Sequence, residues 1–235
     1  MELKETEKTT EVVLERMENT MMNLEQMSFD SINITDRIVT LLSDARELFA
    51  AFKTGDEKDK EEALKQALEI IGEGSTVAMG GCQSAGEIGL IQALNDGNYN
   101  YADRADMTPR ESLMYAYDAD VFLSSVNAMT NDGILVNIDG NSNRVSCIAQ
   151  GPKKVVFIVG MNKVCSDIDE AMKRARNVAA PANAQRFDVK TPCKTTGKCF
   201  DCKSPDTICC NFLITRYSRH TGRMHVILVN DVLGY

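Results

Sequence analysis

The stretch Val155-Val156-Phe157-Ile158-Val159 is apolar at every position and lies shortly after the turn-forming pair Gly151-Pro152. A strand with one face in water alternates apolar and polar residues, whereas a strand covered on both faces is apolar throughout. This stretch therefore predicts an inner strand of a sheet that has helices packed on both faces.

The segments around this strand alternate between helical and extended patterns. Apolar residues at spacings of three and four predict helices at residues 58–71, 85–94, 109–117 and 166–177. Short apolar runs predict strands at residues 76–79, 119–123, 126–130 and 134–138, and the last two flank Asn131-Asp132-Gly133, a hairpin signal. The order predicts an α/β fold with antiparallel additions.

The two ends of the chain differ from this central part. Residues 1–72 carry apolar residues at helical spacing, and we expect an N-terminal helical segment packed on the core. Residues 73–190 form the predicted α/β core. In the last part, residues 191–235, a cysteine-rich loop precedes two alternating runs at 212–217 and 225–230, which predict a terminal β-hairpin.

Composition excludes several classes of function. The chain has 235 residues, of which 43% are hydrophobic and 26% charged, which is usual for a globular protein. Its net charge of -8 and the absence of a dense basic stripe argue against nucleic-acid binding. No apolar run is long enough to predict a membrane span, and the charged N-terminus does not match a secretory signal. We expect a cytoplasmic protein, in which thiols stay reduced.

The residues TPCKTTGKCFDCKSPDTICCN, numbered 191–211, contain five of the eight cysteines. Cys193, Cys199, Cys202 and Cys209 give the spacing C-x5-C-x2-C-x6-C, and Cys210 is an alternative fourth ligand. The loop is long and has almost no apolar residues, so a metal held by four thiolates would account for its order.

The spacing leaves the metal open. Zinc sites with four cysteines favour paired C-x2-4-C motifs, and only Cys199 and Cys202 form such a pair. A 4Fe-4S cluster tolerates wider and unequal spacing. Both metals accept four thiolates, so zinc remains the alternative. A further thiol, Cys82, lies at the start of the predicted helix 85–94, where a helix N-terminus would lower its pKa.

A second group of polar residues follows the predicted strands, where open α/β sheets bind their ligands. The glycine turn after residue 79 offers close backbone approach, and an arginine suits a carboxylate or phosphate. The predicted anion-binding residues are Gly80, Gly81, Ser84, Arg104, Asn137, Asn143 and Arg144. The candidate general bases are Glu87 and Asp139. The alternative for each Asn and Asp is a structural role in turns and caps.

Several motifs occur in an order that resembles one known family. They are GGCQSAGEIGL, Asp103-Arg104, DVFLSSVNAMTNDGILVNIDGNSNRV, GPKKVVFIVGMNKV, RNVAAPANAQR and TPC…TGKC…C…SPDTIC. Together they resemble the LUD-domain (lactate utilization protein) family, in a short stand-alone form with a cysteine-bearing tail. The resemblance covers roughly residues 65–235.

The resemblance implies a fold and a process. The fold is a NagB/RpiA/CoA-transferase-like three-layer α/β/α sandwich. The process is the oxidation of a small hydroxy acid such as lactate, in which this chain would be an iron–sulfur electron-transfer or accessory component. It favours a 4Fe-4S cluster, redox partner proteins and a small anionic ligand; a homo-oligomer is also compatible. The alternatives are a non-redox isomerase, transferase or hydrolase with structural zinc, and a non-catalytic scaffold.

Overall fold

The computed structural model describes residues 57–235, with the backbone alone at Glu57, and the predicted helices before residue 57 lie outside this part. The described residues belong to one compact unit of the chain. Their first element is α3 (Glu57–Ile71), which agrees with the helix predicted at 58–71.

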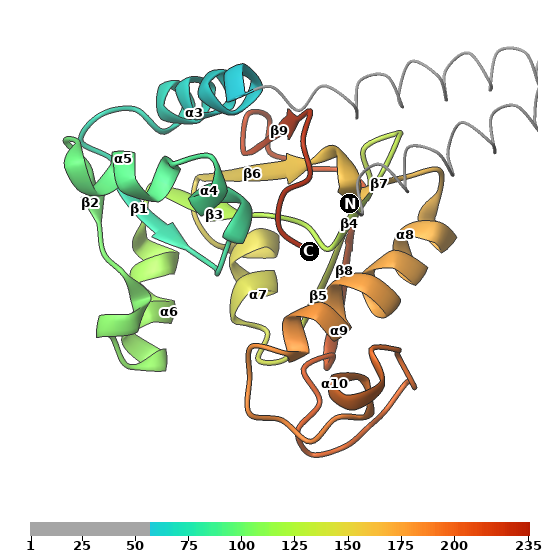
Figure 1. Cartoon of the computed structure of the whole chain (residues 1–235). Coiled ribbons are helices and arrows are strands. Elements are labelled where there is room, and N and C mark those ends of the chain that lie inside the picture. Colours follow the sequence, from blue (N-terminus) through green and yellow to red (C-terminus); the bar gives the residue numbers. More distant parts are fainter. Residues whose placement is uncertain (1–56) are drawn as a thin grey trace, which may run out of the picture. The chain divides into compact units, whose positions relative to one another are not determined.

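A parallel sheet of five strands forms the centre of the fold (Figure 1). Its order is β2-β1-β3-β6-β9, and every neighbouring pair is parallel. The strands are β1 (Thr76–Met79), β2 (Asn100–Tyr101), β3 (Val121–Ser124), β6 (Lys154–Gly160) and β9 (Met224–Val229). All residues of β6 after Lys154 are buried, which confirms the inner strand predicted from its apolar run.

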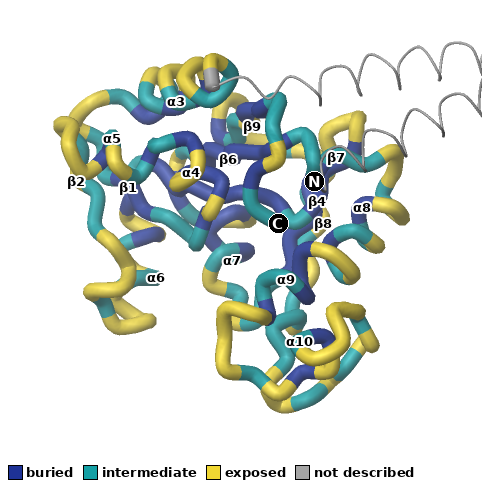
Figure 2. The backbone as a smooth tube through the Cα atoms, in the orientation of Figure 1, coloured by how far each residue is buried: buried dark blue, intermediate teal, exposed yellow. Residues whose placement is uncertain are grey.

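Helices cover both faces of this sheet. On one face, α3 and α5 (Leu90–Asp96) pack on residues such as Val77 and Ile158. On the other, α6 (Pro109–Asp118) and α7 (Asn143–Gln150) pack on Phe122 and Phe157. Figure 2 shows the inner strands β3 and β6 in the colour of buried residues, while exposed residues lie on the outer sides of the helices. The three layers agree with the predicted α/β/α arrangement.

A mixed sheet of four strands adjoins the first, in the order β7-β4-β5-β8. Its strands are β4 (Ala128–Thr130), β5 (Leu135–Asp139), β7 (Val164–Cys165) and β8 (Asn211–Thr215). β4 and β5 are antiparallel, which confirms the predicted hairpin. At its turn Gly133 has φ +94°, and the Thr130 hydroxyl accepts the backbone N–H of Ile134 at 2.8 Å.

The predicted terminal hairpin is wrong. β8 pairs antiparallel with β5, with Leu213 opposite Asn137, whereas β9 pairs parallel with β6, with Met224 opposite Val155. The two strands therefore complete different sheets. Alternating residues suit an edge strand as well as a hairpin arm, because both present one face to a core and the other to solvent.

The predicted helices differ from the structure in three places. The segment 85–94 is two helices, α4 (Gln83–Glu87) and α5, because Gly89 has φ +77° and breaks the run. α8 (Ile168–Arg174) starts after its cap Asp167 as expected, but continues into the π-helix η3 (Ala175–Ala179) and α9 (Ala180–Ala184). The helix α7 was not predicted. The remaining short helices are η1 (Arg104–Asp106), η2 (Met161–Lys163) and α10 (Pro192–Thr196).

Arg223 fixes the C-terminal end of α7. This buried side chain donates to the carbonyls of Cys147, Ile148 and Pro152 at 2.7–3.0 Å. Carbonyls at the end of a helix are short of N–H partners within the helix, and the guanidinium supplies further donors to them. The Cys147 carbonyl also accepts the backbone N–H of Gly151 at 2.9 Å. Separately, none of the helices within residues 57–235 is both long and apolar enough to cross a membrane.

Candidate functional site

Two adjoining cavities, of about 760 and 590 Å³, open at the carboxyl ends of β1, β3 and β5. This is the edge at which open α/β sheets place their ligands. The residues that line both are Gly80, Gly81, Gln83, Arg104, Asn141, Asn143, Arg144 and Arg186. Three of these eight residues are arginines, so the arrangement suits an anion.

The two glycines after β1 allow the arginines to come close. A Cβ on Gly80 would lie 2.8 Å from Cγ of Arg144 and 2.5 Å from Cζ of Phe122. Gly81 has φ +75°, and a Cβ there would lie 3.1 Å from Nη2 of Arg104. The backbone at this turn therefore lies close to both arginine side chains, and a Cβ at Gly80 would collide with Phe122 and Arg144.

The environments of Arg144 and Arg104 differ. The Arg144 guanidinium donates to Oδ1 of Asn127 at 3.0 Å and to the carbonyl of Ile138 at 2.7 Å. Burial is the main cause that lowers its pKa from the ordinary value. Arg104 is exposed at the rim. One arginine is thus fixed by the fold, and the other is open to solvent and to a ligand.

The two candidate bases have structural partners. Oδ2 of Asp139 accepts the backbone N–H groups of Arg144 at 2.9 Å and Val145 at 3.1 Å, so it caps α7. It also lines the smaller cavity. Glu87 is exposed and lines neither cavity; its Oε2 accepts the backbone N–H of Gly234 at 2.7 Å. The geometry brings only Asp139 to the cavities.

Lys163, which follows β6, is a buried residue of this region. Its Nζ donates to Oγ of Ser125 at 2.9 Å and to Oγ of Ser84 at 3.2 Å. Burial lowers the pKa of Lys163 to about 8, and nearby Arg174 and Arg144 act in the same direction. Lys163 and Ser125 line the smaller cavity, whereas Ser84 lies behind them and lines neither.

The two predicted asparagines have separate locations. Asn143 lines both cavities. Asn137 is fully buried in β5 and lines neither, and its amide N and O have no hydrogen-bond partner among the described residues. Arg186, which sequence reasoning missed, lines both cavities. Its position in the RNVAAPANAQR motif was the available signal.

The four predicted cysteine ligands line one small cavity in the tail. Cys193, Cys199, Cys202 and Cys209 all contribute to its wall. Cys210 does not; it is exposed, and its thiol donates to the carbonyl of Thr207 at 3.6 Å. The fold therefore gathers the four cysteines of the C-x5-C-x2-C-x6-C pattern and turns the alternative fourth cysteine outward.

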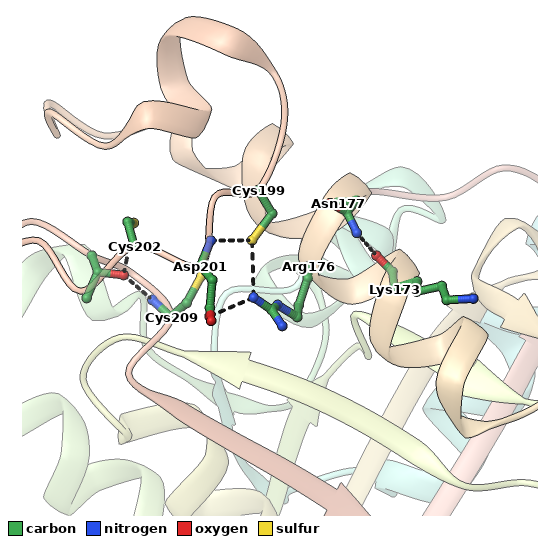
Figure 3. Close-up of polar contacts among 8 residues, drawn as sticks. Lys173, Arg176, Asn177, Cys199, Asp201, Cys202 and Cys209 are labelled. Carbon is green, nitrogen blue, oxygen red and sulfur yellow. Dashed lines mark hydrogen bonds and ion pairs between the residues drawn. The ribbon is translucent and has the colours of Figure 1, made fainter.

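Arg176, in the π-helix η3, reaches this cavity from the core (Figure 3). Its Nη2 donates to Sγ of Cys199 at 3.7 Å and forms an ion pair with Asp201 at 2.6 Å. The backbone N–H of Asp201 also donates to Sγ of Cys199, at 3.4 Å. Hydrogen bonds of this kind stabilise a negatively charged thiolate.

The donor set fits a metal chemically, because four thiolates suit either zinc or an iron–sulfur cluster. Burial is the main cause that raises the pKa of Cys209 to about 11, and the neighbouring cysteines raise it further. Within residues 57–235, however, no three His, Cys, Asp or Glu side chains are already arranged to hold a metal ion. The cysteines share a cavity, and binding a single ion would require them to rearrange.

The cysteines outside the tail are buried or half-buried free thiols. Cys82 is buried beside the glycine turn, and burial raises its pKa to about 11. The prediction of a lowered pKa is therefore wrong, because desolvation outweighs any benefit from the start of the short helix α4. Burial likewise raises the pKa of Cys147 to about 11 and that of Cys165 from its ordinary value.

The tail joins the two regions through Ile208, which lines both the cysteine cavity and the smaller arginine cavity. The next residue but one, Cys210, donates its backbone N–H to the carbonyl of Asp139 at 3.0 Å. The cysteine loop is therefore anchored on the turn between β5 and α7.

Comparisons with known proteins show the family to which the chain belongs. The chain is similar to a crystal structure of a DUF162 family protein from Deinococcus radiodurans, with 12% identity and a TM-score of 0.30 over 74% of this chain and 98% of that one. No match was found among curated proteins. The family model described as the LUD domain matches residues 57–229, so the chain belongs to the LUD-domain family.

Proposed function

We propose that this LUD-domain protein binds a small organic anion, such as lactate, and carries a thiolate-bound metal centre. In this proposal it is an electron-transfer or accessory component in the oxidation of a small hydroxy acid. The observation that carries the proposal is that four cysteines of the tail line one cavity, which shares Ile208 with the arginine-lined cavity. A 4Fe-4S cluster, when bound, would supply one-electron transfer there.

The arginine cavity supports the anion-binding part. Arg144 is held beside Gly80 by Asn127 and by the carbonyl of Ile138, so its guanidinium is already oriented. A planar guanidinium binds a carboxylate through two parallel hydrogen bonds. Exposed Arg104, which lies next to Gly81, would bind the same carboxylate from the rim of the cavity.

The cysteine cavity supports the metal-binding part. Cys193, Cys199, Cys202 and Cys209 would hold the centre, and Arg176 would neutralise part of the negative charge of the thiolates. We further propose that the protein works in the reducing environment of the cytoplasm and exchanges electrons with redox partner proteins. We propose no nucleic-acid ligand for it. It also includes the NagB/RpiA/CoA-transferase-like class, which the helix-covered parallel sheet supports.

Anaerobic purification followed by absorbance spectroscopy and metal analysis tests the redox part. A brown protein with a broad band at about 400 nm supports it. A colourless protein with about one zinc per chain contradicts it and favours the non-redox alternative with a structural metal. Calorimetric titration with lactate tests the anion site independently, with Arg144→Gln as the weakened variant.

A further inference from the structure

Ser125, Lys163 and Ser84 form a compact polar cluster at the carboxyl end of β3. Lys163 Nζ lies 2.9 Å from Ser125 Oγ and 3.2 Å from Ser84 Oγ, and the two hydroxyl oxygens are 3.5 Å apart. A nucleophile within hydrogen-bond reach of a base, with the base oriented by a third group, is the signature of an activated nucleophile. Pairs of serine and lysine serve this purpose in unrelated folds.

The surroundings of Lys163 suit a base. Its side chain is 3% exposed and forms no ion pair with a carboxylate of residues 57–235. The groups that influence its charge are Cys82, Glu87, Arg144 and Arg174, and burial is the largest influence. A pKa of about 8 leaves part of the amine neutral near pH 7, and a neutral amine can accept the serine proton.

The C-terminal segment packs against the cluster, and Gly234 and Tyr235 line the same 590 Å³ cavity as Ser125 and Lys163. Gly234 has φ +57°, and a Cβ there would lie 3.0 Å from Ser84 Oγ and 3.1 Å from Lys163 Nζ. The backbone N–H of Gly234 is held by Glu87 at 2.7 Å. Ser84 and Lys163 are thus shielded on this side, and Ser125 faces the 590 Å³ cavity.

We propose that Ser125 and Lys163 form a nucleophile–base pair that cleaves an ester or thioester whose acyl group carries a carboxylate. The proposal rests on the proposed function in one respect, because Arg144 and Arg104 of the anion site would hold that carboxylate. Ser84 is a positioning residue that fixes the amine of Lys163. No metal takes part in this reaction.

The reaction balances with water as the only further reactant. The Ser125 Oγ forms a bond to the acyl carbon while Lys163 Nζ takes the hydroxyl proton. The bond from the acyl carbon to the alkoxide or thiolate breaks, and the leaving group receives that proton as an alcohol or thiol. Water then hydrolyses the acyl-serine, with Lys163 again serving as base, and releases the acid.

The test uses a fluorophosphonate probe on the full chain, because phosphonylation of a serine requires the same activation as acylation. We expect mass spectrometry of peptides to place the label on Ser125. The labelling rate should rise about tenfold per pH unit below pH 8 and level off above it, since Lys163 must be neutral and its pKa is about 8. Label on other serines alone, or a rate independent of pH between 6 and 9, overturns the proposal.

Variants make the test specific. Ser125→Ala should abolish the label, Lys163→Met should slow it at least a hundredfold, and Ser84→Ala should shift its pH profile. Ser166→Ala, at an exposed serine outside both cavities, is the matched control and should label at the wild-type rate. If Lys163→Met does not fold, as judged by circular dichroism, the wild-type pH profile and the site of labelling still decide the question.

A second measurement separates this inference from the anion site. Hydrolysis of a nitrophenyl ester that carries a free carboxylate is compared with hydrolysis of nitrophenyl acetate. A preference of tenfold or more for the charged ester supports the proposed substrate class. Equal rates contradict that class. Labelling of Ser125 in a protein that binds no lactate would refute the anion-binding function while leaving the nucleophile–base pair in place.

Discussion

Gly140 and Ile208 meet backbone to backbone. A Cβ on Gly140 would lie 3.2 Å from Cα of Ile208 and 3.4 Å from its carbonyl oxygen. Gly140 begins the turn from β5 to α7, and Ile208 directly precedes Cys209, so this contact joins the proposed anion site to the proposed metal centre. The position of one region should therefore depend on the other.

Replacing Gly140 with valine should displace the segment that carries Cys209. The branched side chain would collide with the Ile208 backbone. Displacing a group that holds a metal ligand in position typically costs roughly tenfold in metal affinity. Metal retained after dialysis against a chelator measures the effect. Gly86→Ala is the control, since a Cβ there makes only an ordinary 3.6 Å contact with Ile91. Equal metal retention in both variants would show that the contact does not support the metal site.

Replacing Arg176 with glutamine should weaken the metal centre without unfolding the chain. The variant loses the ion pair with Asp201 and the charged donor to Cys199. Loss of such a partner costs about 10- to 100-fold in metal affinity. Competition with a chelator provides the measurement. Lys173→Gln is the control. It removes an exposed ion pair with Glu170 within α8, the helix that precedes η3, and should leave metal affinity unchanged.

Asp139 can be tested as a cap and as a base with two substitutions. Asp139→Ala removes the acceptor for two N–H groups of α7 and should destabilise the protein by about 1 kcal/mol. Asp139→Asn keeps a carbonyl acceptor and should retain most of that stability. Urea denaturation measures both variants. If Asp139→Asn instead loses catalytic activity while its stability and its lactate binding stay at the wild-type level, Asp139 acts as a general base.

Replacing Arg223 with alanine should be among the most destabilising changes in the described part of the chain. It leaves the carbonyls of Cys147 and Ile148 in α7, and that of Pro152 just after it, without their charged donor, at a cost on the order of 3 kcal/mol. The displaced helix carries Arg144, so lactate affinity should fall as well. Arg219→Ala, at an exposed position, should change the midpoint of urea denaturation little.

Local sequence patterns predicted the fold where they had one interpretation. The uninterrupted apolar residues of β6 require cover on both faces, and Asn131-Asp132-Gly133 requires a tight turn between β4 and β5. The terminal hairpin failed because the alternation in β8 and β9 specifies a half-buried strand but not its partner. α7 was missed because the polar turn before it concealed its start at Asn143.

The candidate site shows the same limit. Gly80, Gly81 and Arg144 were predictable because each residue type suits an anion, and the fold brings them together. The contact of Lys163 with Ser84 and Ser125 gave no such signal, because these partners are 79 and 38 residues away in the sequence. Only the pairing of β1, β3 and β6 places these three side chains in contact.

The metal content of single cysteine variants tests the central claim most directly. Iron, sulfide and zinc are measured per chain in anaerobically purified wild type, Cys209→Ser and Cys210→Ser. We predict about four iron and four sulfide per chain in the wild type and in Cys210→Ser, whose thiol points away from the cavity, and a marked loss in Cys209→Ser. A wild type without bound metal, or equal metal content in the two variants, would contradict the assignment of Cys193, Cys199, Cys202 and Cys209 as the metal ligands.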